Sequence, residues 1–256
     1  MMGNLINCIN MTTSDSGIIK NLSGKGINTI RYYVGETTNG NTFSIADILP
    51  VAKEAVSLGI NWIMHIDMRN IITSDGSPVP TEARMFIRAS ERKTFEFVLK
   101  NLQMLKSENA LPSIVEIDCE MNVIFPEVKL GSEDEKRVLN AAINGAKAEN
   151  PDMKVMFYLS SGLDNEACKK PVNRFFVAGG RPFEYLSVDF TGKGLSDLYT
   201  LSQNISDLSR RFEKDIIIVE TSDTCDDELS DVLIQSLAAV PLERGLGVIF
   251  SDKTVC

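Results

Sequence analysis

Residues 216–220 read Ile216-Ile217-Ile218-Val219-Glu220, an unbroken β-branched run that ends in an acid. β-Branched residues favour extended chain. A strand without polar residues on either face is typical of a parallel sheet that is covered by helices. The run therefore predicts an α/β protein with at least one strand buried on both faces.

Helical patterns lie on both sides of this strand. Apolar residues recur at helical spacing from Leu198 to Phe212 before it and from Leu229 to Val240 after it, where Pro241 ends the pattern. The same alternation of extended and helical segments continues to both ends of the chain. It gives eight predicted strands: Asn4–Asn10, Thr29–Val34, Asn61–Asp67, Ile114–Glu120, Lys154–Leu159, Tyr185–Phe190, Ile216–Glu220 and Leu246–Phe250.

The number of strands predicts a closed barrel. Dividing 256 residues by eight gives 32 for each unit, the size of a βα repeat. We therefore predict one (β/α)8 TIM barrel domain over residues 1–256. Only six residues follow Phe250, so we expect no eighth helix, and the uncovered side of the barrel would offer a contact for a homo-oligomer. The alternative, an open doubly wound sheet, lacks a Gly-x-Gly-x-x-Gly motif after the first strand.

Composition narrows the classes of partner. Lys and Arg number 26 against 35 Asp and Glu, a net charge of -9, and no basic stripe is present, so we expect no nucleic-acid partner. No apolar run approaches the ~20 residues of a membrane span, so we expect no membrane partner. The segment Met1–Asn7 lacks the features of a signal peptide, which predicts a cytoplasmic protein, or an extracellular one if a leader has been removed.

Five cysteines are widely spaced, without a Cys-x-x-Cys pair: Cys8, Cys119, Cys168, Cys225 and Cys256. An odd number at such spacing indicates reduced thiols, not a disulfide framework or a zinc site. We expect no metal and no cofactor.

Polar residues collect where the predicted strands end, which is where barrel enzymes place their chemistry. Glu120 and Glu220 are 100 residues apart, about three units, and would face each other across the barrel mouth. Two facing carboxylates suit retaining glycoside hydrolysis: one donates a proton, the other attacks the anomeric carbon, and they lie about 5–5.5 Å apart. The alternative is that both are ordinary acids at strand ends.

Several segments carry a resemblance to a known family. Gly26–Tyr32, Leu111–Met121, Phe175–Gly180 and Ile217–Thr221 occur in the order and spacing of four motifs of arabinogalactan endo-β-1,4-galactanases. The chain thus resembles glycoside hydrolase family 53, retaining (β/α)8 barrels with catalytic glutamates on strands four and seven, over residues 24 to 225. This resemblance implies a glycosidase of carbohydrate metabolism that acts on β-linked galactan-type oligo- or polysaccharide.

The resemblance also implies residue roles. Glu120 matches the acid/base, Glu220 matches the nucleophile, and Arg31 matches an arginine that would hold the nucleophile ionised. The chain departs from the family at Cys119, which replaces an asparagine that bonds the sugar 2-hydroxyl. It departs again on the third and sixth strands. We expect the substrate-binding residues to be Arg31, His65, Asp67, Cys119 and Asp189.

Those departures leave two other hypotheses open. In the first, the barrel keeps the fold and both glutamates but binds carbohydrate or a protein partner without turnover. In the second, the protein is a metal-assisted hydrolase, although the spacing of its acids fits no known ligand pattern. The candidate ligands for that second hypothesis are His65, Asp67, Asp118, Glu120 and Asp189.

Strand geometry raises one further question. Glu116, Asp118 and Glu120 share one parity, so all three would face the same side of the fourth strand. Buried acids need partners, for which Arg31 and Lys154 are candidates. The acids would form either a ladder that raises the pKa of Glu120, an oxygen-rich cation site, or a structural ion-pair network inside the barrel.

Overall fold

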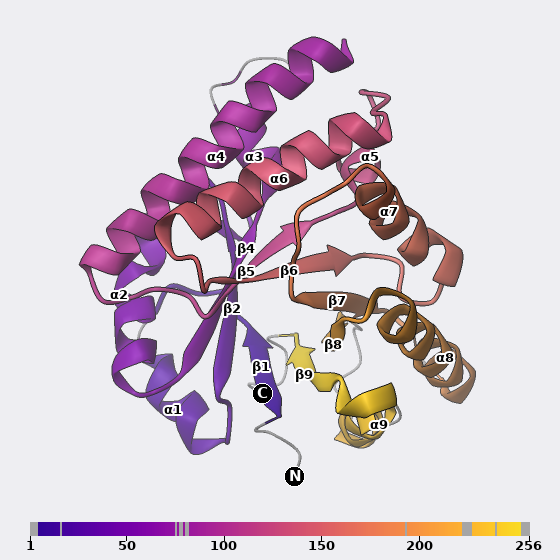
Figure 1. The fold of residues 1–256 in the computed structure, drawn as a ribbon. Helices are drawn as coiled ribbons and strands as arrows, with labels where there is room; N and C mark the ends of the chain where they lie inside the picture. Colours follow the sequence, from indigo (N-terminus) through magenta and orange to yellow (C-terminus); the bar gives the residue numbers. More distant parts are fainter. Residues whose placement is uncertain are drawn as a thin grey trace.

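In the part of the chain that the structure describes, eight strands of one nine-stranded parallel sheet close into a barrel (Figure 1). Their order is β1-β9-β8-β7-β6-β5-β4-β2, and β1 also pairs with β2. The strands are β1 (Ile6–Asn10), β2 (Thr29–Val34), β4 (Asn61–Ile66), β5 (Ile114–Asp118), β6 (Lys154–Leu159), β7 (Tyr185–Phe190), β8 (Asp215–Glu220) and β9 (Gly245–Phe250). The predicted (β/α)8 barrel is confirmed.

This computed structural model describes residues 5–15, 17–74, 76, 79, 82–192, 194–221, 227–238 and 240–251. The first strand was predicted from Asn4, which lies outside these residues. The described part stops at Ser251, so the prediction that no helix follows β9 also lies outside it.

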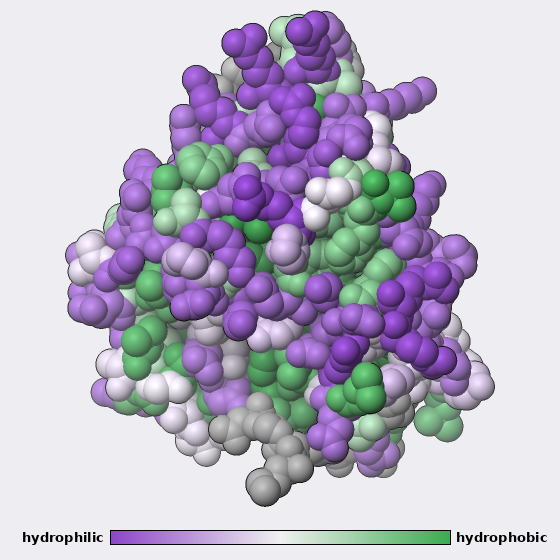
Figure 2. Space-filling model, in the orientation of Figure 1, coloured by the Kyte–Doolittle hydropathy of each residue, from purple (hydrophilic) through white to green (hydrophobic). Residues whose placement is uncertain are grey.

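Helices surround the barrel, and α4 packs along α6 (Figure 1). The helices are α1 (Ile18–Gly24), α2 (Ile45–Ser57), α3 (Met68–Thr73), α4 (Ala83–Ser107), α5 (Met121–Ile124), α6 (Ser132–Glu149), α7 (Asn165–Val177), α8 (Leu195–Phe212) and α9 (Asp227–Ala238), with a 3-10 turn, η1 (Pro241–Glu243). In the face seen in Figure 2, hydrophilic side chains cover much of the surface and hydrophobic ones show in smaller groups. No helix of the described residues is both long and apolar enough to cross a membrane.

The prediction is corrected at the end of β5 and by one additional strand. β5 ends at Asp118, two residues earlier than predicted, because the chain turns into α5 and Glu120 becomes its N-cap. The two-residue strand β3 (Thr42–Phe43) was not predicted and pairs with the end of β2. Both differences lie at the carboxyl-terminal mouth of the barrel.

The apolar core has two layers. In β8, Ile217 and Val219 point into the barrel lumen, whereas Ile216 and Ile218 pack in the layer between barrel and helices. This division explains why the strand has no polar face. The lumen cluster is Cys8, Ile63, Ile114, Met156, Ile217, Val219 and Ile249. A network of polar side chains also lies inside the barrel, around Arg31 and Glu116, which are both fully buried.

Closure of the barrel depends on a close approach between β1 and β9. A Cβ atom at Gly247 would lie 2.0 Å from the carbonyl oxygen of Ile6, which is backbone and cannot move aside. We predict that Gly247→Ala destabilises the fold by at least ~1–3 kcal/mol through overpacking. Gly24→Ala is the control, because nothing lies within 4 Å of its Cβ position and the residue is helical. Urea denaturation of both variants checks this; equal stabilities would contradict it.

Candidate active site

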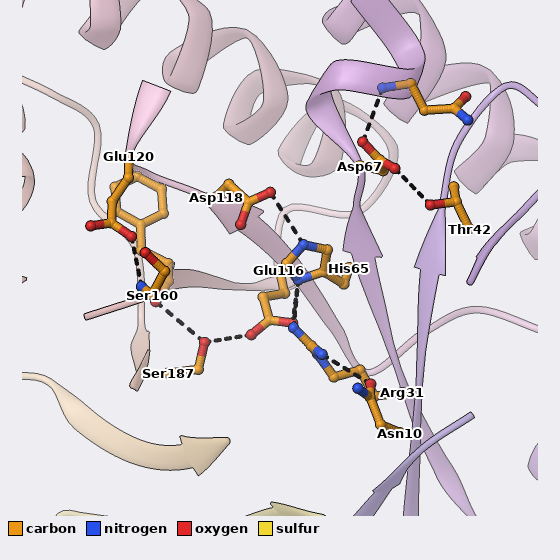
Figure 3. A network of polar contacts seen from close by, with 12 residues as sticks. Asn10, Arg31, Thr42, His65, Asp67, Glu116, Asp118, Glu120, Ser160 and Ser187 are labelled. Carbon is orange, nitrogen blue, oxygen red and sulfur yellow. Dashed lines mark hydrogen bonds and ion pairs between the residues drawn. The ribbon is translucent and has the colours of Figure 1, made fainter. Parts of the chain in front are cut away.

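A buried ion pair lies at the centre of the polar network (Figure 3). The Nε atom of Arg31 is 2.5 Å from Oε2 of Glu116, and neither side chain is exposed. Nη1 of Arg31 donates to Oδ1 of Asn10 at 2.9 Å. The guanidinium carbon lies 4.4 Å from the ring centroid of Tyr33. Strands β1, β2 and β5 are therefore joined through one side chain.

His65 links this pair to the barrel mouth. Its Nδ1 is 2.8 Å from Oε2 of Glu116, and its Nε2 is 3.3 Å from Oδ2 of Asp118, a partly exposed carboxylate. Nη2 of Arg31 approaches the same Nδ1 at 2.7 Å. Burial and the nearby positive charge of Arg31 lower the pKa of His65. The carboxylates of Asp118 and Glu116 outweigh both effects and raise the pKa to about 10. His65 therefore lies between two carboxylates, which favour its protonated form.

Glu116 stays ionised in the lumen. Burial alone would raise its pKa. The positive charges of Arg31 and His65 outweigh that effect and lower the pKa to about 2. Ser187 on β7 donates a hydrogen bond to the other carboxyl oxygen of Glu116. Of the two predicted partners, Arg31 makes the pair, whereas Lys154 lies exposed at the start of β6. The acids of β5 thus form a structural ion-pair network. Of the three expected arrangements, the ion-pair network is the one that the contacts of Glu116 and Asp118 form, and Glu120 lies beyond the strand.

Glu120 and Glu220 lie at the same barrel mouth, on different strands. Glu120 follows β5, and its Oε2 accepts a hydrogen bond from the backbone N–H of Ser160 at 2.6 Å (Figure 3). Glu220 ends β8, and its Oε2 accepts from the backbone N–H of Ser251 at 3.4 Å and from its hydroxyl at 3.2 Å. Both side chains are buried, with 9% and 6% of their surface exposed. Each carboxylate is held by the backbone at the end of a neighbouring strand.

Asp189 lies at the mouth end of β7 and is also buried. Its Oδ1 accepts a hydrogen bond from the hydroxyl of Thr221 at 2.8 Å. Burial raises its pKa to about 6, against the lowering effects of Thr221, Arg31 and Tyr158. The site therefore contains a carboxyl group that changes charge in the mildly acidic range.

Two tyrosines belong to the site although neither was predicted as a substrate-binding residue. The ring of Tyr33 lies 4.2 Å from that of His65, and the ring of Tyr158 lies 5.4 Å from it on the other side of the network. Tyr158 has the parity of Met156, which faces the lumen, so strand alternation was the signal that could have found it.

Two predicted site residues lie elsewhere. Asp67 caps α3: its carboxylate accepts from the backbone N–H of Asn70 at 2.9 Å and from the hydroxyl of Thr42 at 2.6 Å. Cys119 is 1% exposed and packs in the apolar layer outside the lumen, because it has the opposite parity to Asp118. The expectation that Cys119 meets the sugar is therefore not met, and the binding role of Asp67 stays a prediction.

Metal ligation was the last open hypothesis for these acids. Among the residues that the structure describes, no group of three or more His, Cys, Asp or Glu side chains is arranged to hold a metal ion. Asp67 is turned toward Thr42 and Asn70, away from His65 (Figure 3). The five candidate ligands thus do not come together as one site.

A closed parallel barrel with carboxylates at its carboxyl-terminal mouth defines the class of (β/α)8 enzymes. The family model described as "Glycosyl hydrolase family 53" matches residues 9–238. The chain belongs to glycosyl hydrolase family 53. A curated relative, an uncharacterised protein of Niallia circulans, is 21% identical over 208 residues. That match covers 76% of this chain, and the chain spans 57% of the relative's length.

Solved structures share the fold. The GH53 catalytic domain of Ignisphaera aggregans is 17% identical with a TM-score of 0.76, and the match covers 97% of this chain and 84% of that one. A fungal β-1,4-galactanase is also 17% identical, with a TM-score of 0.72 over 92% and 80% of the two chains. A GH26 β-mannanase of Bacteroides ovatus has a TM-score of 0.68 at 15% identity, over 98% and 80%.

We predict that Glu116→Gln destabilises the protein by about 3–5 kcal/mol, because it leaves the buried guanidinium of Arg31 without a counter-charge. Glu108→Gln is the matched control: its pair with Lys53 is 2.7 Å long but largely exposed, so its loss should cost no more than about 1 kcal/mol. Chemical denaturation at neutral pH measures both values. A cost for Glu116→Gln no larger than that of the control would contradict the prediction.

The same pair sets a pH dependence. An acid whose pKa falls from 4.5 to about 2 on folding adds stability that is present above pH 4.5 and is lost as the pH falls toward 2. The difference in unfolding free energy between the wild type and Glu116→Gln should therefore be constant from pH 4.5 up to about 6, below the range in which His65 titrates, and shrink between 4.5 and 2. Denaturation curves across this range test it; a difference that grows toward low pH would refute the assignment.

Proposed function

We propose that the protein is a retaining glycoside hydrolase that cleaves β-linked galactan-type glycan. The observation that carries the proposal is the pair of buried glutamates at one barrel mouth, Glu120 after β5 and Glu220 at the end of β8. The family to which the chain belongs supports glycan hydrolysis. The fold that the chain shares with a fungal β-1,4-galactanase supports the choice of galactan.

In this reaction Glu220 attacks the anomeric carbon while Glu120 donates a proton to the leaving oxygen. The leaving sugar departs with that proton, and the galactosyl group stays on Glu220 as an ester. Glu120 then removes a proton from water, whose oxygen breaks the ester and forms the hydrolysed product. The hydrogen bonds from Ser160 and Ser251 orient the two carboxylates for these steps.

The buried network supports the site from below. Arg31, His65 and Glu116 fix the strands around the lumen and hold Asp118 at the mouth. Asp189 and Tyr158 line the same end of the lumen, where polar groups would meet the sugar hydroxyls. The predicted role of Arg31 in keeping Glu220 ionised remains a proposal, since its hydrogen bonds run to Glu116 and Asn10 and its third contact is with Nδ1 of His65.

A second candidate function is glycan binding without turnover. The observation that favours it is the burial of Cys119, because a family asparagine that bonds the sugar 2-hydroxyl has no counterpart in the site. Titration calorimetry with galactan oligosaccharides, next to a turnover assay, separates the two functions. Binding without product would favour this second candidate.

We predict that Glu220→Ala abolishes hydrolysis and that Glu120→Ala lowers it by about 10²–10⁴-fold on galactan. On an aryl galactoside with a good leaving group, Glu120→Ala should reduce the rate of bond cleavage far less, because the aryl group departs without being protonated. Added azide should give an α-galactosyl azide with Glu220→Ala and a β-galactosyl azide with Glu120→Ala, because only the former variant lacks the ester intermediate. Undiminished galactan hydrolysis by either variant would overturn the assignment.

A further inference from the structure

A surface pocket of about 580 Å³ lies between α4 and α6, on the outer wall of the barrel. These two helices pack along each other in Figure 1, and hydrophilic side chains cover the same face in Figure 2. The pocket is lined by four arginines, Arg88 and Arg92 on α4, Arg137 on α6 and Arg181 after α7. Of the described residues that line it, one, Glu91, is an acid.

This arginine pocket has the opposite sign to the protein as a whole. The chain carries a net charge of -9, whereas the lining residues carry four positive charges against one negative charge. The arginines come from three separate parts of the sequence, so the chain shows no basic stripe, and folding brings them together. A local positive potential on an acidic molecule draws anions to that place and away from the rest of the surface.

Three of the guanidinium groups are available to a ligand. Those of Arg88 and Arg181 make no hydrogen bond or ion pair with any residue that the structure describes. The Arg92 side chain is 75% exposed, and its ion pair with Glu96 is 4.0 Å long. Arg181 is anchored beside α6, because its backbone N–H donates to Oδ1 of Asn140 at 2.9 Å. The cations are thus fixed to the walls of the pocket without being neutralised there.

The fourth arginine shows which anion the pocket suits. Arg137 already binds a carboxylate with two prongs: Nε is 3.2 Å from Oε1 of Glu91, and Nη2 is 2.5 Å from Oε2. Arginine forks match the planar carboxylate group in this way. Phe95 on α4 also lines the pocket and is half-buried, which leaves part of a flat apolar ring beside the cations. Carboxylates next to an apolar ring face are what a uronic acid sugar presents.

We propose that the arginine pocket binds an acidic glycan, a chain of uronic acid units. Its carboxylates pair with Arg88, Arg92 and Arg181, and the C–H face of one sugar ring packs against Phe95. The volume of the pocket lies within the range of ligand sites. Several separate cations around one aromatic ring suit a ligand that repeats both its charge and its ring.

This inference goes beyond the proposed hydrolysis. Neither Glu120 nor Glu220 lines the arginine pocket, so an acidic chain bound there leaves the barrel mouth open. The pocket thereby keeps the protein on a glycan that carries both acidic and neutral sugars, while the mouth acts on the neutral ones.

The first test measures binding. A hexamer of α-1,4-linked galacturonate is titrated into the protein in a calorimeter. The double variant Arg88→Gln/Arg92→Gln should weaken binding at least about tenfold through lost charged hydrogen bonds, and Phe95→Ala at least about threefold. Arg210→Gln on α8 is the control, because Arg210 is also an exposed helical arginine and does not line the pocket. An affinity that is the same in the wild type and the double variant would overturn the proposal.

The second test identifies the ligand class. Neutral β-1,4-galactohexaose should show no loss of affinity in the double variant, and added salt should weaken binding of the galacturonate hexamer by screening. Hexaglutamate and hexametaphosphate carry the charge without the sugar ring, so both should bind more weakly than the galacturonate hexamer. If either binds as tightly and depends equally on Arg88 and Arg92, the pocket recognises charge alone and the assignment to a glycan is wrong.

The third test locates the bound chain. In isotope-labelled protein the galacturonate hexamer should shift the backbone amides of Arg92, Phe95 and Arg137. Shifts confined to the surroundings of Glu120 and Glu220 would place the acidic chain at the mouth and overturn the inference. Because binding needs no turnover, a protein that binds at the pocket but hydrolyses no galactan loses only the proposed function. A galactan hydrolase that does not bind the hexamer loses only this inference.

Discussion

The buried pair of Arg31 and Glu116 is the interaction on which the rest of the site depends. Two opposite charges, fully removed from water, remain favourable only while each keeps its partner and its hydrogen bonds. Asn10, His65 and Ser187 supply those bonds from β1, β4 and β7. A single ionic centre therefore sets the relative position of five strands of the barrel.

The barrel lumen contains an apolar cluster and a charged network, whereas the two candidate catalytic glutamates lie at its mouth. Its apolar cluster packs as an ordinary core, and the charged network presents a small number of polar groups at the mouth. Glu120 and Glu220 are held differently, by backbone N–H groups of adjoining strand ends. The two glutamates are thereby placed by the path of the main chain, which is the most rigid part of a barrel.

Much of this architecture could be predicted because a strand buried on both faces appears in the sequence as a continuous run of β-branched apolar residues. Runs such as Ile216–Val219 located the strands, and alternation correctly placed Glu116 and Asp118 on one side of β5. The sequence alone could not show whether Arg31 or Lys154 pairs with Glu116, because the answer depends on where each residue lies along the barrel axis.

The local positions of Cys119 and Asp67 can both be predicted from the sequence. Alternation already turned Cys119 away from the lumen, and Asp67 followed by Asn70 at the start of a helix has the composition of an N-cap. The early end of β5 was harder to foresee, because α5 is only four residues long.

The pairing of β1 with β9 has a consequence for synthesis of the protein on the ribosome. The first strand acquires one of its two neighbours only after residues 245–250 have emerged. Until then the growing sheet has two open edges, which are surfaces that other extended chains can join. Nascent chains of this protein are therefore expected to depend on chaperones until β9 has emerged and paired with β1.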